Sequence, residues 1–215
     1  MPKLGSRRAD GAFSPSAELY EGLKVVGRSL LAALIVGMIA VLPAGAQTIK
    51  ERLSTCLGCH GENGQSQNPD IPLLGAQQAF YVTVQLVMFR QGLRAYAPMN
   101  DATKGLSDDD VRGIADFIAK LPAPPPPAGP VDQDRIARAR ALVQQNHCDI
   151  CHTPNFAGQQ NVPRIGDQRE DYLIKALRGY KDNSRHGYDT TMAETIASVS
   201  DDQILDLAYY IARVK

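Results

Sequence analysis

Tryptophan is absent from this 215-residue chain, and cysteine occurs only four times. Lysine plus arginine number 23 and aspartate plus glutamate also number 23, so the formal net charge is zero. Without an excess of either sign, the charge gives no reason to expect nucleic acid or an anionic membrane surface as the main partner. No stretch alternates apolar and polar residues convincingly as a strand would. We therefore expect an all-α protein in which the few cysteines are the informative residues.

The N-terminal region is typical of an export signal. A positively charged stretch precedes an apolar run from Leu30 to Leu42, and the small residues Ala44 to Ala46 follow it. The run is shorter than the roughly 20 residues that a helix needs to cross a bilayer. We predict a signal peptide over residues 1–46 and a periplasmic location; an uncleaved membrane anchor is the alternative.

A proline-rich segment divides the rest of the chain. Proline lacks an amide donor and has a fixed φ, so residues 122–130 are predicted to form a stiff, extended linker. On either side of it the sequence repeats itself with a period of about ninety residues. We expect an N-terminal domain over residues 47–121 and a C-terminal domain over residues 131–215.

Each repeat is expected to contain three short helices. The closing helix of each begins after a serine, Ser107 or Ser200, which is suited to cap it. The middle helices are predicted from apolar residues at helical spacing, namely Phe80, Val84, Val87 and Met88 in the first repeat and Leu173, Ala176, Leu177 and Tyr180 in the second. Three short helices enclose little apolar volume, so each domain needs a further core component.

The four cysteines form two copies of the motif Cys-X-X-Cys-His, which is the signature of c-type haem attachment. One helical turn places both thiols along one porphyrin edge, and the adjoining histidine then reaches the iron. A redox dithiol or half of a zinc site are alternatives for a lone Cys-X-X-Cys pair, but the repetition with histidine favours two covalently bound haem c groups. The copies are Cys56, Cys59 and His60, and Cys148, Cys151 and His152.

The second axial ligand distinguishes an electron carrier from a catalyst, because an open iron site invites peroxide or dioxygen. Met99 and Met192 match in the repeat, and each lies in a turn-prone stretch about forty residues after its histidine. Met88 fits a helical apolar pattern, where core packing is the better interpretation. We predict that the iron ligands are His60 with Met99, and His152 with Met192.

Other polar residues have less definite predicted roles. His147 and His186 are expected at the surface, with replacement of a methionine ligand as the alternative for either. The carbonyl groups of Pro72 and Pro163 lie where they could accept the N–H of each haem-ligating histidine, although an ordinary loop turn is an equal alternative. Side chains that could neutralise or bind haem propionates are Arg90, Arg94, Lys181, Arg185, Tyr81 and Tyr172, with a solvated surface position as the default for each.

These residues give the chain a resemblance to the dihaem class I c-type cytochromes of the cytochrome c4 family, over nearly all of residues 47–215. The resemblance depends on Cys-Leu-Gly-Cys-His-Gly-Glu-Asn-Gly, on Ile-Pro-Leu-Leu-Gly-Ala-Gln and on Pro98-Met99, and Thr153 departs from it by replacing a glycine. It implies two tandem cytochrome c folds that face each other, with haem propionates near the interface.

The resemblance also implies a function. Such proteins carry electrons in a respiratory chain, from a bc complex or a dehydrogenase to a terminal oxidase. The alternative is a tightly bound cytochrome subunit of an exported dehydrogenase, such as a sulfide-oxidising flavocytochrome. A dihaem peroxidase would need one vacant iron site, and the two well-placed methionines argue against it. We therefore expect an electron carrier, not an enzyme, with redox proteins as its partners. We expect it to bind neither a small-molecule substrate nor nucleic acid. Membrane association is the further alternative.

Overall fold

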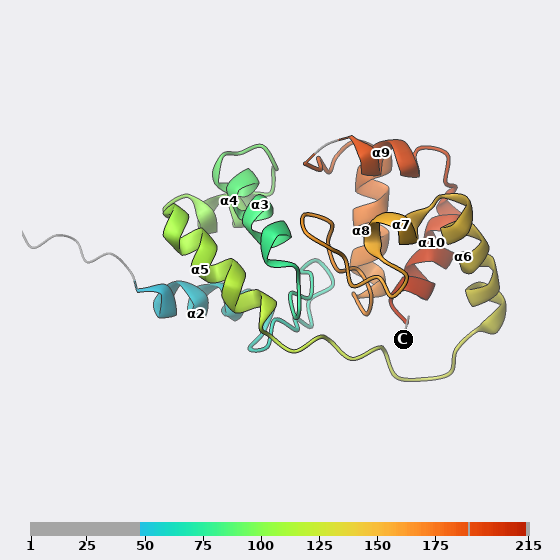
Figure 1. Cartoon of the computed structure of the whole chain (residues 1–215), viewed down its shortest axis with the longest axis horizontal. Helices are drawn as coiled ribbons and strands as arrows, with labels where there is room; N and C mark the ends of the chain where they lie inside the picture. Colours follow the sequence, from blue (N-terminus) through green and yellow to red (C-terminus); the bar gives the residue numbers. More distant parts are fainter. Residues whose placement is uncertain (1–47, 189, 214–215) are drawn as a thin grey trace, which may run out of the picture. The chain divides into compact units, whose positions relative to one another are not determined.

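A computed structural model describes residues 48–188 and 190–213 (Figure 1). The predicted signal peptide over residues 1–46 therefore lies outside the described residues. The chain from Gln47 to Lys215 forms one compact unit, and both repeats belong to it. The domain boundaries at residues 46, 121 and 130 remain predictions.

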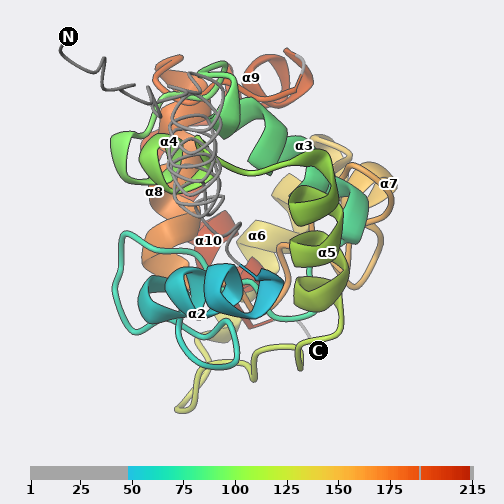
Figure 2. The same cartoon turned by 90° about the vertical axis from the view of Figure 1, so that its left-hand side faces the viewer.

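The first repeat contains helices α2 to α5. Helix α3 packs against both α4 and α5, and α2 crosses α5 (Figure 2). An apolar cluster between α3 and α5, with Leu106, forms the core of this repeat. The helices are α2 (Ile49–His60), α3 (Ala79–Arg90), α4 (Ala97–Thr103) and α5 (Asp108–Ala119).

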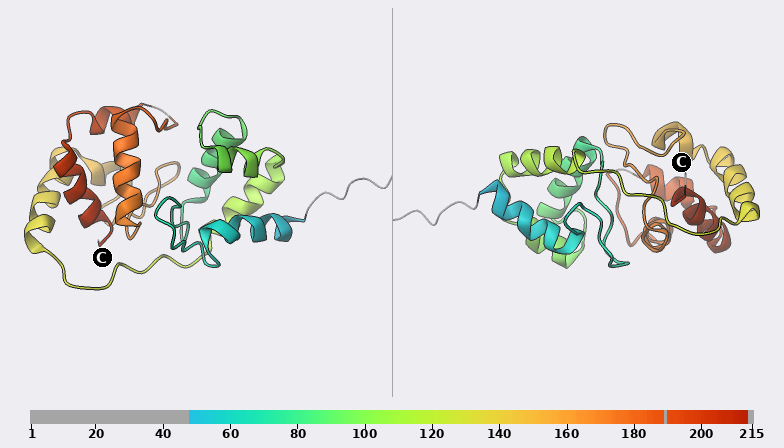
Figure 3. Two further views of the ribbon diagram at one scale, coloured as in Figure 1. Left: turned by 180° about the vertical axis from the view of Figure 1, so that it is seen from behind. Right: turned by 90° about the horizontal axis from the view of Figure 1, so that it is seen from below.

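The second repeat contains helices α6 to α10. Helix α10 packs against α6 on one side and against α8 on the other, while α9 contacts α8 (Figure 3). The apolar core lies where these helices meet, around the fully buried Ile204 and Phe156. The helices are α6 (Gln133–Gln145), α7 (Cys148–His152), α8 (Glu170–Lys181), α9 (Thr191–Ile196) and α10 (Asp201–Ile211).

Between 48 and 213, residue 189 aside, the structure has no strand, only an isolated bridge between Gln159 and Val162. The predicted all-α fold is thus confirmed. The linker over residues 122–130 forms neither helix nor strand, and Figure 1 shows it running from α5 to α6. No helix among the described residues is long and apolar enough to span a membrane.

The closing helices begin as the sequence predicted. Ser107 Oγ accepts from the Asp110 amide at 3.1 Å, and the Asp110 carboxylate accepts from the Ser107 amide at 2.8 Å. Ser200 and Gln203 make the same reciprocal pair before α10, at 3.2 and 2.8 Å. Each capping box satisfies amide groups that have no partner within the helix.

The details of the other helices differ from the prediction. In α3, Phe80 is 57% exposed, and the buried residues are Val82, Leu86, Met88 and Phe89. The predicted apolar face was therefore partly wrong, because an almost wholly apolar helix gives no clear periodicity. The stretches around Met99 and Met192 form the short helices α4 and α9 instead of turns. Helix α6 was not foreseen individually.

Candidate haem sites

The first motif lies on one continuous helix. Thr48 caps α2 with a capping box, and the helix ends at His60. Cys56 is half-buried, Cys59 is exposed and His60 is only 8% exposed. Neither cysteine forms a disulfide, and the helical turn between them presents both sulfur atoms to the same side, as thioether attachment requires.

The second motif is built on two helices. Helix α6 ends at Gln145, and His147 takes the left-handed conformation with φ 54° before α7 begins at Cys148. Within α7 the pattern of the first motif returns, because Cys148 is half-buried, Cys151 is exposed and His152 is buried. One helical turn therefore carries the chemistry in both repeats, although the chain reaches that turn differently.

Both motif histidines are held by a proline carbonyl, as the sequence allowed. His60 Nδ1 lies 3.2 Å from the Pro72 oxygen, and His152 Nδ1 lies 2.9 Å from the Pro163 oxygen. A carbonyl oxygen only accepts, so Nδ1 must carry the proton in each ring, and Nε2 is left with the free lone pair that a metal needs.

Burial shifts the pKa values of the motif histidines and of the first cysteine in each motif. It lowers the pKa of His60 and of His152, because the charged imidazolium is disfavoured away from water, so both rings are neutral and able to ligate. Burial also raises the pKa of the Cys56 and Cys148 thiols.

The two methionines occupy equivalent places. Met99 lies in α4 and Met192 lies in α9; both are half-buried and packed against the apolar cluster of their own repeat. Each is thus fixed on an element separate from its motif helix. Their ligation of iron remains a prediction.

The remaining candidates divide into two groups. His147 and His186 are exposed, as expected for surface residues. Arg90 donates to the Leu106 carbonyl at 2.9 Å and to Asp108, and Lys181 donates to the Val199 carbonyl. These two cations hold the loops that precede the closing helices, which is a structural role that the sequence did not predict.

Arg94 and Arg185 instead approach a cluster of half-buried tyrosines, Tyr81, Tyr172 and Tyr180. Arg185 Nη1 donates to the Tyr172 hydroxyl at 3.1 Å, and its guanidinium carbon lies 5.1 Å from the Tyr180 ring centroid. Burial raises the pKa of Tyr81 in the same cluster, while Arg185 and Arg94 oppose that shift. The tyrosine cluster draws residues from both repeats.

The tyrosine cluster fits an anionic cofactor. Arg185 is half-buried, forms none of the ion pairs found among the described residues, and its Nε is shielded from solvent with no hydrogen-bond partner there. A cation that loses hydration without a carboxylate beside it is costly. A haem propionate, which is a carboxylate, would satisfy both the charge and the unused donor.

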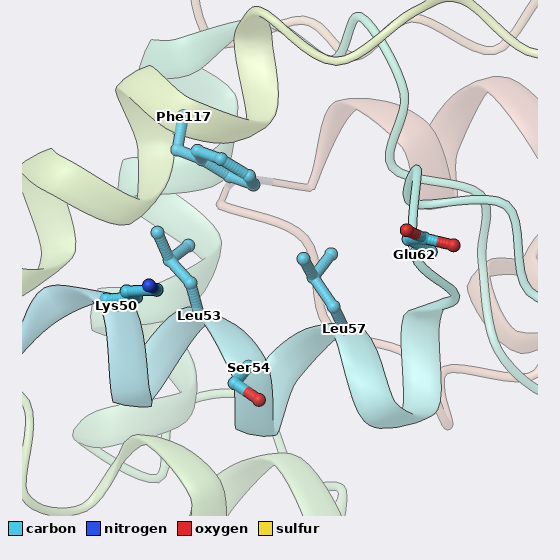
Figure 4. A pocket seen from close by; sticks show the side chains of 6 residues that line it. All are labelled: Lys50, Leu53, Ser54, Leu57, Glu62 and Phe117. Atoms are coloured by element: carbon cyan, nitrogen blue, oxygen red, sulfur yellow. The ribbon is translucent and has the colours of Figure 1, made fainter.

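An apolar cavity opens beside the first motif. Leu53 and Leu57 project from α2 toward Phe117 of α5 (Figure 4). Leu53 and Phe117 also pack against the apolar core of the first repeat. The residues that line the cavity are Lys50, Leu53, Ser54, Leu57, Glu62 and Phe117.

Two glutamines join the repeats and were given no role by the sequence argument. Gln77 and Gln168 are buried, at 6% and 7% exposure. Each uses its amide group to bind the backbone of the other repeat, at Arg164 and at Leu73 respectively. The available signal was their presence at matching positions of the two repeats, as the last residue of Ile-Pro-Leu-Leu-Gly-Ala-Gln and its copy.

Comparison with known proteins identifies the class. The family model described as cytochrome c matches residues 136–215. Cytochrome c-554(548) of Halomonas halodenitrificans is 35% identical over 73 residues, which cover 33% of this chain and 88% of that protein. With two haem-attachment motifs in place, the chain is a c-type cytochrome that carries two covalently bound haem c groups.

Longer matches define the group within that class. Cytochrome c4 of Pseudomonas aeruginosa is 27% identical over 194 residues, covering 85% of this chain and 95% of that protein. The structure of reduced cytochrome c4 from Pseudomonas stutzeri superposes with a TM-score of 0.69 at 25% identity, covering 79% of this chain and all of that one. The thiosulfate dehydrogenase electron acceptor of Thiomonas intermedia is 28% identical over 196 residues, covering 86% and 90%.

The chain belongs to the c-type cytochromes, its similarity to cytochromes c4 extends over most of its length, and its fold is two tandem cytochrome c folds. It is a dihaem electron-transfer protein, an electron carrier rather than an enzyme, and other redox proteins are its partners.

Proposed function

We propose that this chain is a periplasmic electron shuttle in which His60 and Met99 ligate one iron, and His152 and Met192 ligate the other. It would take electrons from a bc complex or a dehydrogenase and pass them to a terminal oxidase. The four cysteines, Cys56, Cys59, Cys148 and Cys151, would only tether the haems.

One observation carries this proposal: the same set of groups occurs twice within one compact unit. Each set has a buried neutral histidine whose Nδ1 is bound to a proline carbonyl, and a half-buried methionine on a separate helix of the same repeat. Histidine opposite methionine gives a six-coordinate iron that changes oxidation state with little rearrangement, and thioether ligation raises its potential. Those are properties of a carrier.

An optical and redox titration of the mature protein tests the proposal. Two covalent haems, each with the weak far-red band of methionine sulfur on ferric iron and each at positive potential, are expected. A haem that lacks this band, and that binds cyanide or reacts with peroxide, would contradict the ligand assignment and the carrier function together.

A dedicated acceptor subunit of an exported dehydrogenase is the second candidate. The similarity to a thiosulfate dehydrogenase electron acceptor favours it. Ile150, between the second pair of motif cysteines, is 68% exposed, whereas the matching residue of the first motif is Gly58. Purification of the native protein distinguishes the two candidates, since a shuttle would elute alone and an acceptor subunit would stay with a catalytic partner.

A further inference from the structure

The two glutamines at the repeat interface each bind both the amide and the carbonyl of one residue in the other repeat. Gln168 Oε1 accepts from the Leu73 amide at 2.9 Å, and its Nε2 donates to the Leu73 carbonyl at 2.9 Å. Gln77 Oε1 accepts from the Arg164 amide at 2.7 Å, and its Nε2 donates to the Arg164 carbonyl at 3.0 Å. Each side chain thus completes both hydrogen bonds of one backbone residue across the interface.

The peptide groups concerned are those that hold the motif histidines. The Leu73 amide and the Pro72 carbonyl belong to a single peptide unit, whose oxygen accepts from His60 Nδ1. The Arg164 amide and the Pro163 carbonyl likewise form one unit, whose oxygen accepts from His152 Nδ1. A continuous hydrogen-bonded chain therefore runs from His60 through one peptide to Gln168 of the other repeat, and from His152 to Gln77.

Such a chain affects the iron through the basicity of its ligand. When the amide of a peptide donates, the peptide polarises, and its oxygen becomes a stronger acceptor. A stronger acceptor at Nδ1 gives the imidazole more anionic character, which favours ferric iron. Because Gln77 and Gln168 are buried, water is not available to replace their oxygen atoms.

We propose that Gln168 and Gln77 are positioning residues that set the reduction potential of the haem in the opposite repeat: Gln168 through His60, and Gln77 through His152. Each repeat thereby tunes the electron affinity of its neighbour, and the two haems are adjusted only when the repeats are docked. The inference depends on the proposed ligation by His60 and His152.

The interface offers a matched control. Gln78 also reaches across, and its Nε2 donates to the Ala157 carbonyl at 2.9 Å and to the Gly158 carbonyl at 3.3 Å. Neither carbonyl belongs to the peptide whose oxygen binds the His152 ring, although the Gly158 amide donates to the His152 backbone carbonyl at 2.9 Å. Gln78→Leu therefore removes inter-repeat hydrogen bonds of the same chemistry while leaving intact both peptides that bind the histidine rings.

The test uses the holoprotein with both haems. In Gln168→Leu, we expect the haem attached to Cys56 and Cys59 to be reduced more easily, with a roughly threefold higher ratio of reduced to oxidised haem at a fixed applied potential. The His60 Nδ1 proton resonance of the reduced protein should move upfield, and that of His152 should not. In Gln77→Leu, the haem attached to Cys148 and Cys151 should be the one that is reduced more easily, and the His152 Nδ1 proton resonance should be the one that moves.

Gln168→Glu provides the rescue variant, because either protonation state of the carboxyl retains an acceptor for the Leu73 amide. The first haem should then stay at or below its wild-type potential. If Gln168→Leu does not fold, Gln168→Asn, which is too short to reach the Leu73 amide, takes its place.

The proposal would be overturned by a shift in the haem of the mutated repeat, by equal shifts in both haems, or by an effect equal to that of Gln78→Leu. No shift in either haem would also overturn it. Failure of the ligand assignment gives a separate signature, since it would appear in the optical spectrum of the wild-type protein before any glutamine is changed.

Discussion

The two repeats reach the same chemistry through different local frames. In the first, α2 runs without a break from Ile49 to His60; in the second, α6 ends, His147 turns the chain and α7 supplies only Cys148 to His152. In both, the histidine is buried and bound to a proline carbonyl. The comparison teaches that haem attachment constrains one helical turn and its loop partner, and leaves the preceding helix free to vary.

The repeats also differ in the number of apolar side chains that they bury. The buried apolar cluster of the second repeat has eleven members and includes residues from α6, whereas that of the first has seven and includes none from α2. The first repeat should therefore depend more on haem for its stability.

Removal of the thiols is expected to have the largest effect and tests this dependence. Cys56→Ala with Cys59→Ala should abolish haem attachment in the first repeat and most of its protection against amide exchange. Cys148→Ala with Cys151→Ala should abolish attachment in the second repeat but leave α6 and α10 protected. Haem counting and amide exchange measure both, with Gly58→Ala as a control, because a Cβ there meets no atom within 4 Å. Equal loss of protection would contradict the comparison.

Removal of a methionine should affect one haem only. Met99→Ala and Met192→Ala should each lower the potential of the haem in the same repeat and allow an exogenous ligand to bind there, because the thioether raises the potential and closes the sixth position. Potentiometry and cyanide binding are the measurements. Met88→Leu, at a buried methionine of α3, should change neither. Unchanged potentials in Met99→Ala and Met192→Ala would remove the ligand assignment.

Exchanging the residue that follows each motif should change the free energy of unfolding in opposite directions in the two repeats, with a smaller effect than haem or ligand loss. Gly61 has φ 84° and Thr153 has φ 71° with ψ 156°, a region that is strained for a residue with a side chain. Thr153→Gly should therefore raise the free energy of unfolding by about 1 kcal/mol, with the lost hydroxyl contacts included.

Gly61→Thr should lower the free energy of unfolding by about 3 kcal/mol or more, because a Cβ would lie 2.8 Å from the Gln65 carbonyl carbon. Denaturant unfolding of the reduced holoprotein measures both changes. Thr153→Ser is the control, since it retains the hydroxyl and the strain. Stabilisation by Gly61→Thr would show that the backbone conformation is not the limiting factor.

The contacts that the closing helices α5 and α10 make with the first helix of their own repeat should differ in how much stability they lose in acid. Asp206 accepts from Arg138 Nε at 2.6 Å and from Arg135 Nε at 3.0 Å, which lowers the pKa of its carboxyl group. The matching residue of the first repeat is Gly113, where a Cβ would lie 3.3 Å from Ile49.

Because the folded pKa of Asp206 is depressed, its stabilisation is present above the unfolded pKa of about 4 and is lost as the pH falls through the folded value. Asp206→Asn should cost about 1 kcal/mol at neutral pH and flatten this acid dependence. Urea midpoints across the pH range are the measurement. Asp116→Asn, at an exposed position of α5, is the control and should leave this pH profile unchanged. If Asp206→Asn still loses stability steeply as the pH falls, other carboxylates are responsible for the acid dependence.

Much of this could be predicted from local sequence. The capping pairs at Ser107 and Ser200 and the surface positions of His147 and His186 follow from neighbouring residues, and the structure confirms them. The apolar face of α3 could not be predicted, since nearly every residue of that helix is apolar and only packing decides which are buried. The sequence also could not tell that Arg90 and Lys181 hold loops whereas Arg94 and Arg185 approach the tyrosine cluster. The partners of these four side chains lie in other elements, so only packing decides them.

The sequence by itself determined the two haem-attachment turns, the twofold repetition and the all-α fold, because thioether attachment, helix capping and helical periodicity act over a few residues. Only the tertiary structure decided that Arg185 enters the tyrosine cluster and that Gln77 and Gln168 bind the peptides that hold the histidines of the opposite repeat. The glutamine contacts join residues that are 87 or 95 positions apart. Such distant pairs are fixed by the docking of folded surfaces, and no local rule specifies them.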